Sequence, residues 1–213
     1  MISFRRQTLA ALLALGICSA FGAGQAGKDY ALIDPPQPTD SGNKVEVIEF
    51  FSYACPHCNH LEPALEAWSH KLPPNVVLRR IPVTFGRTEW VGLAKLHFAL
   101  EALGKGDELS GKVFHAIHEE HNLLSTPDAC ADWAAKQGID RAKFLDAFNS
   151  FGVQTKLQRA NMKASTYAID GVPTLIVDGR YKTSPAMTGG NEGALAEVDE
   201  LIQASAKDKA GHK

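Results

Sequence analysis

The sequence predicts an α/β domain whose sheet is interrupted by a block of helices, and three features lead to this class. Residues 45–51 and 76–83 are rich in β-branched and aromatic side chains, as buried strands are, and apolar residues recur at helical spacing between them. Residues 88–168 then show no strand pattern, and strand-like sequence resumes at 172–177. Two strands joined by a helix are expected to lie parallel in one sheet.

Size and composition fit one globular domain with a large insertion. The chain has 213 residues, 45% of them hydrophobic and 22% charged. A net charge of −2, without a local run of Lys or Arg, lacks the positive field that nucleic-acid binding requires, so we expect no nucleic-acid partner. Four cysteines are too few for a disulfide-framed miniprotein, so their positions are more informative than their number.

Residues 1–26 have the pattern of a cleaved secretory signal peptide. Arg5 and Arg6 precede an apolar run of about 12 residues, and small residues follow up to Ala26. The run is shorter than the ~20 residues that a transmembrane helix needs, and a buried N-terminal helix is the alternative. Cleavage after Ala26 would remove Cys18 and leave the other cysteines in an oxidising compartment.

The first helix is expected to begin directly after the first cysteine of the mature chain. The helical pattern extends from Pro56 to about His70, with Leu61, Leu65 and Trp68 on one face. Proline is well suited to the first helical turn, where its missing N–H removes no hydrogen bond. The preceding cysteine should therefore lie at the N-terminus of this helix.

The long strandless segment is expected to form successive helices. Thr88 can cap a helix that ends near Gly104, and Thr126 can cap one that stops at Gly138. Asp140 can cap a third helix.

The last part of the chain should complete the sheet. Asp178-Gly179 predicts a two-residue hairpin turn into a strand at 180–183. An amphipathic helix is expected over 191–204, and the tail 207–213 is expected to be frayed.

Cys55-Pro56-His57-Cys58 is the most informative stretch. Cys55 would face the unpaired N–H groups and the positive end of the helix dipole, which favour its thiolate and lower its pKa. His57 can add a hydrogen bond or a positive charge. A stabilised thiolate stabilises the reduced form, so the motif predicts a redox site whose disulfide is a strong oxidant.

Other uses of a cysteine pair fit the sequence less well. A structural zinc site needs about four ligands, and apart from the pair only Cys130 remains in the mature chain. Covalent haem attachment requires a histidine where Asn59 stands. A purely structural disulfide would constrain the unfolded chain little across so short a loop. We therefore expect no metal and no cofactor.

Two further sets of residues are predicted to be structural. Cys130 shares a helical face with Trp133, which indicates a buried and unreactive thiol. His115, His118 and His121 lack the i, i+4 pair of zinc-protease helices and are predicted to lie on a solvated face.

Residues 48–58, residues 171–174 and the helical stretch between them resemble the DsbA family of periplasmic thiol:disulfide oxidoreductases. The resemblance covers nearly the whole mature chain and implies a thioredoxin fold with a helical domain inserted in the sheet domain. The implied division is a signal peptide at 1–26, a thioredoxin-like domain made of 27–87 and 169–213, and an inserted helical domain at 88–168.

The resemblance also implies roles for individual residues. Cys55 would be the nucleophile and Cys58 its buried partner, with Pro173 as a cis-proline facing the disulfide. Gly171 and Val172 would then offer backbone to an extended substrate peptide. The charged residues that match the group beneath the family's active site are Glu49, Glu62 and Arg80, the last in place of a familiar Lys. Surface salt bridges are the alternative for these charged residues.

The function implied by the resemblance is that of a monomeric periplasmic enzyme that donates the Cys55–Cys58 disulfide to unfolded or reduced exported proteins. A DsbB-like membrane oxidase linked to quinone would reoxidise the pair. Two alternatives remain open: a disulfide isomerase or reductase, and a peptide-binding chaperone without turnover. Isomerases of this fold usually carry a separate N-terminal dimerisation domain, for which the chain before the first strand is short.

Overall fold

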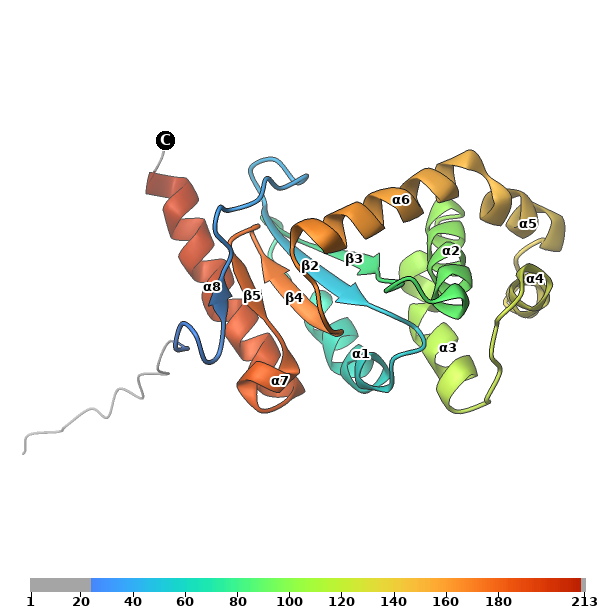
Figure 1. Ribbon diagram of the computed structural model, residues 1–213, viewed down its shortest axis with the longest axis horizontal. Coiled ribbons are helices and arrows are strands. Elements are labelled where there is room, and N and C mark those ends of the chain that lie inside the picture. Colours follow the sequence, from blue (N-terminus) through green and yellow to red (C-terminus); the bar gives the residue numbers. More distant parts are fainter. Residues whose placement is uncertain (1–23, 212–213) are drawn as a thin grey trace, which may run out of the picture.

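The computed structural model describes residues 24–211, so residues 1–23 of the predicted signal peptide lie outside the described residues (Figure 1). Its sheet has five strands: β1 (Ala31–Leu32), β2 (Val45–Phe51), β3 (Val76–Pro82), β4 (Thr174–Val177) and β5 (Tyr181–Thr183). They lie in the order β1-β5-β4-β2-β3. β2 and β3 are parallel, as predicted, and the other neighbouring pairs are antiparallel.

Helices cover the sheet and form a separate layer beside it (Figure 1). They are α1 (Pro56–Ser69), α2 (Thr88–Ala102), α3 (Gly106–His118), α4 (Pro127–Lys136), α5 (Arg141–Asn149), α6 (Phe151–Thr166), α7 (Pro185–Thr188) and α8 (Asn191–Gly211). Helices α2 to α6 all lie between β3 and β4 in the chain. Within residues 24–211, no helix combines the length and the apolar character needed to cross a bilayer.

Strand β2, which lies between β4 and β3, is buried along its whole length, which explains its largely apolar composition. Val45 and Val47 belong to a core shared with α1 and α8, whereas Ile48 and Phe50 belong to a second core shared with α2 to α6. This division follows from the alternation of side chains along a strand. Both cores therefore meet at the strand that leads directly to the cysteine pair.

The caps predicted for two helices of the insertion are confirmed. The Thr126 hydroxyl accepts a hydrogen bond from the N–H of Ala129 at 3.1 Å, and the Asp140 carboxylate accepts one from Lys143 at 2.9 Å. These bonds satisfy backbone donors that the first helical turn leaves unpaired. α6 has a cap of the same kind at Ser150, which the sequence reading missed.

Two predicted helix ends are wrong. Thr88 is the first residue of α2, and Arg87 occupies the capping position without a side-chain hydrogen bond. The C-terminal helix does not stop at residue 204, because α8 continues to Gly211. Lys209 forms an ion pair with Asp178 at 2.7 Å, which connects the last turns of α8 to the β4–β5 turn. This contact explains why the last turns of α8 are ordered rather than frayed.

The predicted turn at Asp178-Gly179 is confirmed, although the flanking strands are shorter than expected. Both turn residues have positive φ, and Arg180 donates a hydrogen bond to the Val177 carbonyl at 3.0 Å. A Cβ atom at Gly179 would lie 2.0 Å from the carbonyl oxygen of Gln37, so this position requires glycine. β4 begins at Thr174, which leaves residues 171–173 as a loop at the end of the sheet.

Candidate active site

The cysteine pair lies where β2 leads into α1, as predicted. Cys55 is the capping residue, with extended backbone angles, and Pro56 is the first residue of the helix. Both thiols are free, so the structure describes the dithiol form. The exposed fraction is 7% for Cys55 and 0% for Cys58, whereas Pro56 and His57 are exposed. Of the two sulfurs, only that of Cys55 can be approached from outside.

The surroundings of Cys55 favour its thiolate. The thiol of Cys58 donates a hydrogen bond to the sulfur of Cys55, and the backbone N–H groups of Cys58 and His57 donate further hydrogen bonds to the same sulfur. The His57 side chain adds a smaller electrostatic contribution. Together these effects outweigh burial and lower the pKa of Cys55 to about 6. The thiol of Cys58 has the opposite tendency, because burial and the hydrogen bond that it donates to Cys55 raise its pKa far above the usual value.

The loop before β4 faces the sulfur of Cys55. The Val172–Pro173 peptide bond is cis, as the resemblance implied. The Cys55 thiol donates to the backbone carbonyl of Val172, with an S–O distance of 3.4 Å. The hydroxyl of Thr174 holds the loop by donating to the Gly171 carbonyl at 2.7 Å. The loop thus places backbone groups directly beside the sulfur of Cys55.

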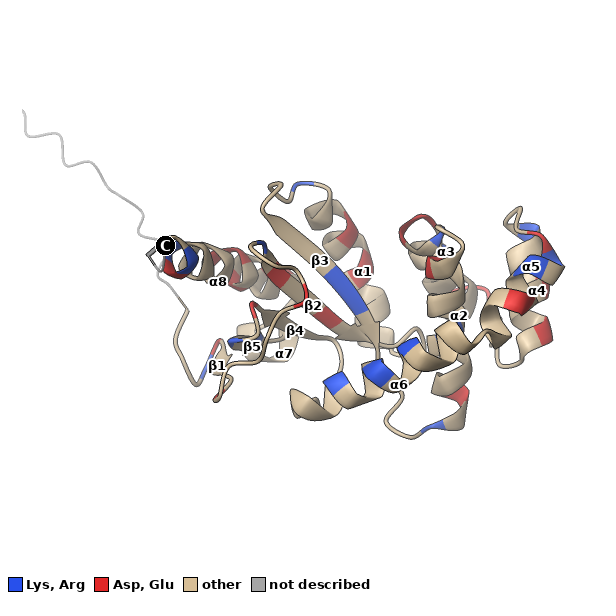
Figure 2. Ribbon diagram, turned by 90° about the horizontal axis from the view of Figure 1, so that it is seen from above, with Lys and Arg blue, Asp and Glu red and all other residues tan. Residues whose placement is uncertain are grey.

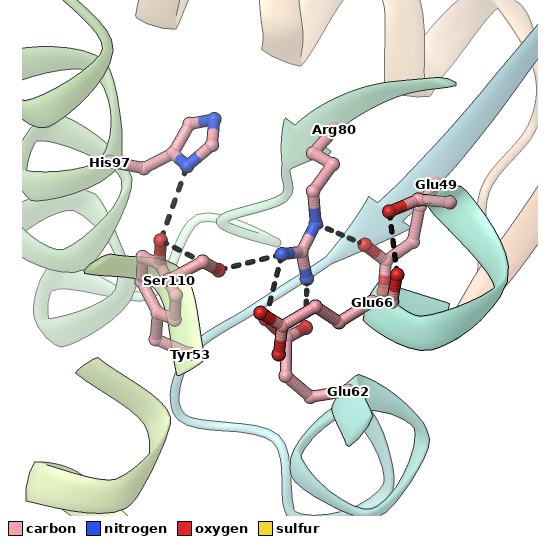
Figure 3. A network of polar contacts seen from close by, with 8 residues as sticks. Glu49, Tyr53, Glu62, Glu66, Arg80, His97 and Ser110 are labelled. Carbon is pink, nitrogen blue, oxygen red and sulfur yellow. Dashed lines mark hydrogen bonds and ion pairs between the residues drawn. The ribbon is translucent and has the colours of Figure 1, made fainter. Parts of the chain in front are cut away.

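Three charged side chains meet in the interior between β2, β3 and α1 (Figure 3). Arg80 donates through Nε to Glu49 at 2.7 Å, and both of its terminal nitrogens donate to the Glu62 carboxylate, one of them at 2.9 Å. Figure 2 shows this basic part of β3 beside acidic positions on β2 and α1. Glu49 is 0% exposed and Glu62 is 4% exposed, so the surface salt-bridge alternative is wrong for both carboxylates.

The Glu49 carboxyl group is the least satisfied member of this group. Burial raises its pKa to about 7 even though Arg80 lowers it. Its Oε1 has no hydrogen-bond partner among the described residues. The carboxylate lies close enough to the cysteine pair for its charge to raise the pKa of Cys58. Glu49 is therefore a buried group that can exchange a proton near neutral pH, next to the redox pair.

A family model described as the DSBA-like thioredoxin domain matches residues 46–194. The chain belongs to the DsbA family. It is 45% identical to the thiol:disulfide interchange protein DsbA of Burkholderia cepacia over 193 residues, covering 90% of this chain and 91% of that protein. It is 39% identical to the Pseudomonas aeruginosa DsbA over 215 residues, covering 98% of this chain and 99% of that protein.

Solved DsbA structures agree with the fold. The crystal structure of Pseudomonas aeruginosa DsbA superposes with a TM-score of 0.83 at 38% identity, covering 89% of this chain and 97% of that chain. Reduced DsbA1 from Neisseria meningitidis gives a TM-score of 0.79 at 30% identity, covering 89% and 98%. The predicted thioredoxin fold and the oxidoreductase class of the DsbA family are thereby confirmed.

Some residues around this DsbA-family site were not foreseen. His118 was predicted to be solvated, but its Nε2 lies 2.8 Å from the backbone oxygen of Tyr53, in the loop before Cys55. The Ser110 hydroxyl accepts a hydrogen bond from Arg80 at 2.6 Å. A sequence signal does exist, because residues 110, 114 and 118 follow an i, i+4, i+8 pattern that puts them on one face of α3.

The other candidate residues behave as structural groups. Cys130 is 0% exposed, and burial raises the pKa of its thiol to about 12, so the prediction of a buried thiol is confirmed. His115 pairs with Glu120 at 3.2 Å on an exposed surface. Across residues 24–211, no three or more His, Cys, Asp and Glu side chains are arranged to hold a metal ion.

Proposed function

We propose that this DsbA-family enzyme is a dithiol oxidase of the periplasm that donates its Cys55–Cys58 disulfide to reduced, newly exported proteins. The observation that carries the proposal is the asymmetry of the two thiols. Cys55 lies at the helix N-terminus with its pKa lowered to about 6, whereas Cys58 is fully buried with its pKa raised. One sulfur is suited to react with substrates and the other to stay inside.

The proposed reaction proceeds in two exchange steps. A substrate thiolate attacks the Cys55 sulfur of the disulfide, so a substrate–Cys55 bond forms, the Cys55–Cys58 bond breaks, and Cys58 leaves as a thiolate that takes up a proton. A second substrate thiolate then attacks the substrate sulfur of the mixed disulfide, and Cys55 leaves as a thiolate. The substrate gains a disulfide, and two electrons pass to the enzyme.

The lowered pKa of Cys55 favours electron transfer from the substrate to the enzyme. At pH 7, a fall from 9 to about 6 stabilises the reduced enzyme by about 1.4 kcal/mol relative to an unperturbed thiol, because about nine tenths of Cys55 is then ionised. For a two-electron couple this corresponds to about 30 mV in the oxidising direction. The same shift makes Cys55 a better leaving group in the second step.

The other site residues are assigned by their contacts. We assign Gly171, Val172 and Pro173 to substrate binding, because this loop faces the Cys55 sulfur and its Gly171 end is exposed. Pro56 and His57 are exposed beside Cys55 and would contact the same peptide. The buried group of Glu49, Glu62 and Arg80 is assigned to charge tuning of the pair.

The reoxidising partner, the oligomeric state and the cell compartment are proposed from membership of the DsbA family. We propose that a DsbB-like membrane oxidase returns the pair to the disulfide and passes the electrons to quinone, and that the enzyme acts as a monomer. Residues 1–26 would direct the chain to the periplasm and be cleaved from the mature protein. We propose that the mature chain consists of a thioredoxin-like domain at 27–87 and 169–213 and an inserted helical domain at 88–168.

The equilibrium potential of the Cys55–Cys58 pair against glutathione tests the proposal. We expect a value less negative than about −180 mV, whereas a value near −270 mV would indicate a reductase and contradict the oxidase assignment. In a second assay, Cys55→Ser should abolish oxidation of a reduced model protein, and Cys130→Ser should retain it as the matched control. The chaperone alternative would be favoured if the unaltered chain did not oxidise the model protein and the Cys55→Ser variant still suppressed its aggregation.

A further inference from the structure

We propose that Ser110 of α3 is a positioning residue for the redox centre, which holds Arg80 against Glu49 and so controls how readily this carboxyl group releases its proton. The inference rests on the proposed function, since it concerns the regulation of the same site. Ser110 lies between β3 and β4 in the chain, far from the motifs that mark the active site. Figure 3 shows how it reaches the charged group from the side of α3.

The guanidinium group of Arg80 has fixed partners for its donors. Nε donates to Glu49 at 2.7 Å, and one terminal nitrogen donates both to Glu62 at 2.9 Å and to the Ser110 hydroxyl at 2.6 Å. The Arg80 side chain is only 13% exposed, so water can hardly replace a lost partner. Without the serine hydroxyl, one buried N–H of the guanidinium would have no acceptor, and the group would turn to find one.

Ser110 is itself held in place by neutral groups. It is 2% exposed, and its hydroxyl accepts a second hydrogen bond from Tyr53 at 3.3 Å. The Tyr53 hydroxyl also contacts Nδ1 of His97 on α2 at 3.3 Å. Burial lowers the pKa of His97 to about 3, so this ring carries no charge that competes with Arg80.

One face of α3 holds both the charged group and the loop before Cys55. Three of its residues contact Tyr53: Ser110 binds the hydroxyl, the Phe114 ring packs edge-on with centroids 4.9 Å apart, and His118 binds the backbone carbonyl at 2.8 Å. Arg80 also lies over the Phe114 ring, with 6.0 Å to its centroid. α3 thus fixes the position of Arg80 relative to the residues that precede the redox pair.

The placement of Arg80 matters because Glu49 has few other sources of stabilisation for its negative charge. Burial, Glu62 on α1 and the sulfur of Cys55 all raise the pKa of Glu49, and Arg80 on β3 lowers it. A displaced guanidinium would therefore leave Glu49 protonated to higher pH. Loss of the carboxylate charge would in turn remove a repulsion that opposes a thiolate at Cys58.

Ser110→Ala tests the proposal in the full-length reduced protein. The readout is the titration of the Glu49 side-chain carboxyl carbon by NMR, together with the pH dependence of the potential of the cysteine pair. We expect the pKa of Glu49 to rise by on the order of half a unit, roughly a threefold increase in proton affinity. Ser150→Ala is the matched control, because it removes a hydroxyl that caps α6 and contacts Val153 instead of the charged group.

A second pair of variants separates the lost hydrogen bond from altered packing. The side chains introduced by Ser110→Thr and Ser110→Val have nearly the same shape, but only threonine keeps the hydroxyl group. We expect the pKa of Glu49 to rise in the valine variant and to stay near the unaltered value in the threonine variant. Equal values in this pair, or an unchanged value in a folded alanine variant, would overturn the role of Ser110.

The same measurements separate this inference from the proposed function. An oxidising potential in the unaltered enzyme, with no shift of Glu49 in the variants, refutes the positioning role alone. A potential near that of a reductase, with Glu49 shifted as expected, refutes the oxidase assignment and leaves the role of Ser110 standing.

Discussion

Replacing Cys58 with alanine should raise the pKa of Cys55, whereas replacing it with serine should leave this pKa low. The largest of the effects that lower the pKa of Cys55 is the hydrogen bond from the Cys58 thiol. Alanine removes that donor. Serine keeps a hydroxyl at the same position, which can donate to the thiolate at least as well. The two variants therefore differ mainly in the one hydrogen bond under test.

The size of the effect follows from the energy of a charge-assisted hydrogen bond. Such a bond contributes about 1.5–3 kcal/mol, which is about 1–2 pKa units. The pKa of Cys55 should thus rise from about 6 to about 7–8 in the alanine variant, and it stays below 9 because the backbone N–H groups of His57 and Cys58 remain. At a pKa of 7.5, the ionised fraction at pH 7 would fall from about nine tenths to about one quarter.

The assay is the ultraviolet absorbance of the thiolate as a function of pH, checked by the pH profile of alkylation. A single alkylation rate is not sufficient, because a thiolate of higher pKa is also the stronger nucleophile and partly offsets the smaller ionised fraction. Unfolding curves of both variants serve as the control for intact structure. Equal midpoints in the alanine and serine variants would refute the reasoning that Cys58 acts through its S–H donor.

Three further predictions concern stability and reactivity. As the pH rises from 6 to about 8.5, the free energy of unfolding of the reduced form should increase relative to that of the oxidised form by at most about 1.4 kcal/mol per pH unit. The reason is that in this range the unfolded chain binds a proton at Cys55 that the folded chain has released. Denaturant curves of both forms at several pH values measure this difference, and a decrease with rising pH would contradict the prediction. Arg80→Met should lower the free energy of unfolding by about 3–5 kcal/mol, because it leaves two buried carboxylates without a counter-charge. The exposed Arg141→Met is its control and should cost clearly less, so similar losses in chemical denaturation would argue against a buried ion-pair group. Cys130 should resist alkylation at pH 8 until denaturant is added, and mass spectrometry that finds it labelled in the folded chain would show that the thiol is accessible.

Local sequence was sufficient wherever the physical cause is local. The caps at Thr126 and Asp140 and the turn at Asp178 depend on hydrogen bonds within a few residues, and all three were predicted. The wrong end of the C-terminal helix, in contrast, depends on a distant residue. The last turns of α8 are ordered by the ion pair of Lys209 with a residue of the β4–β5 turn.

The same distinction holds at the active site. The position of Cys55 at a strand-to-helix junction could be predicted, because the strand pattern, Pro56 and the helical spacing are contiguous in the sequence. The burial of Glu62 could not, because an acidic residue on a helix is exposed unless another element brings it a partner. Arg80, on the next strand, is that partner.

The sequence by itself determined the redox motif, its place at the start of a helix, the long helical insertion between two groups of strands, and through resemblance the DsbA family. Only the tertiary structure decided which groups surround the motif: the Val172 carbonyl at the Cys55 sulfur, and Ser110 at the guanidinium of Arg80. Val172 follows Cys55 by 117 residues, and Ser110 follows Arg80 by 30. The physical reason is that helix starts and turns are fixed by short-range hydrogen bonds. Protonation of a buried site depends instead on burial and on charges brought together by folding.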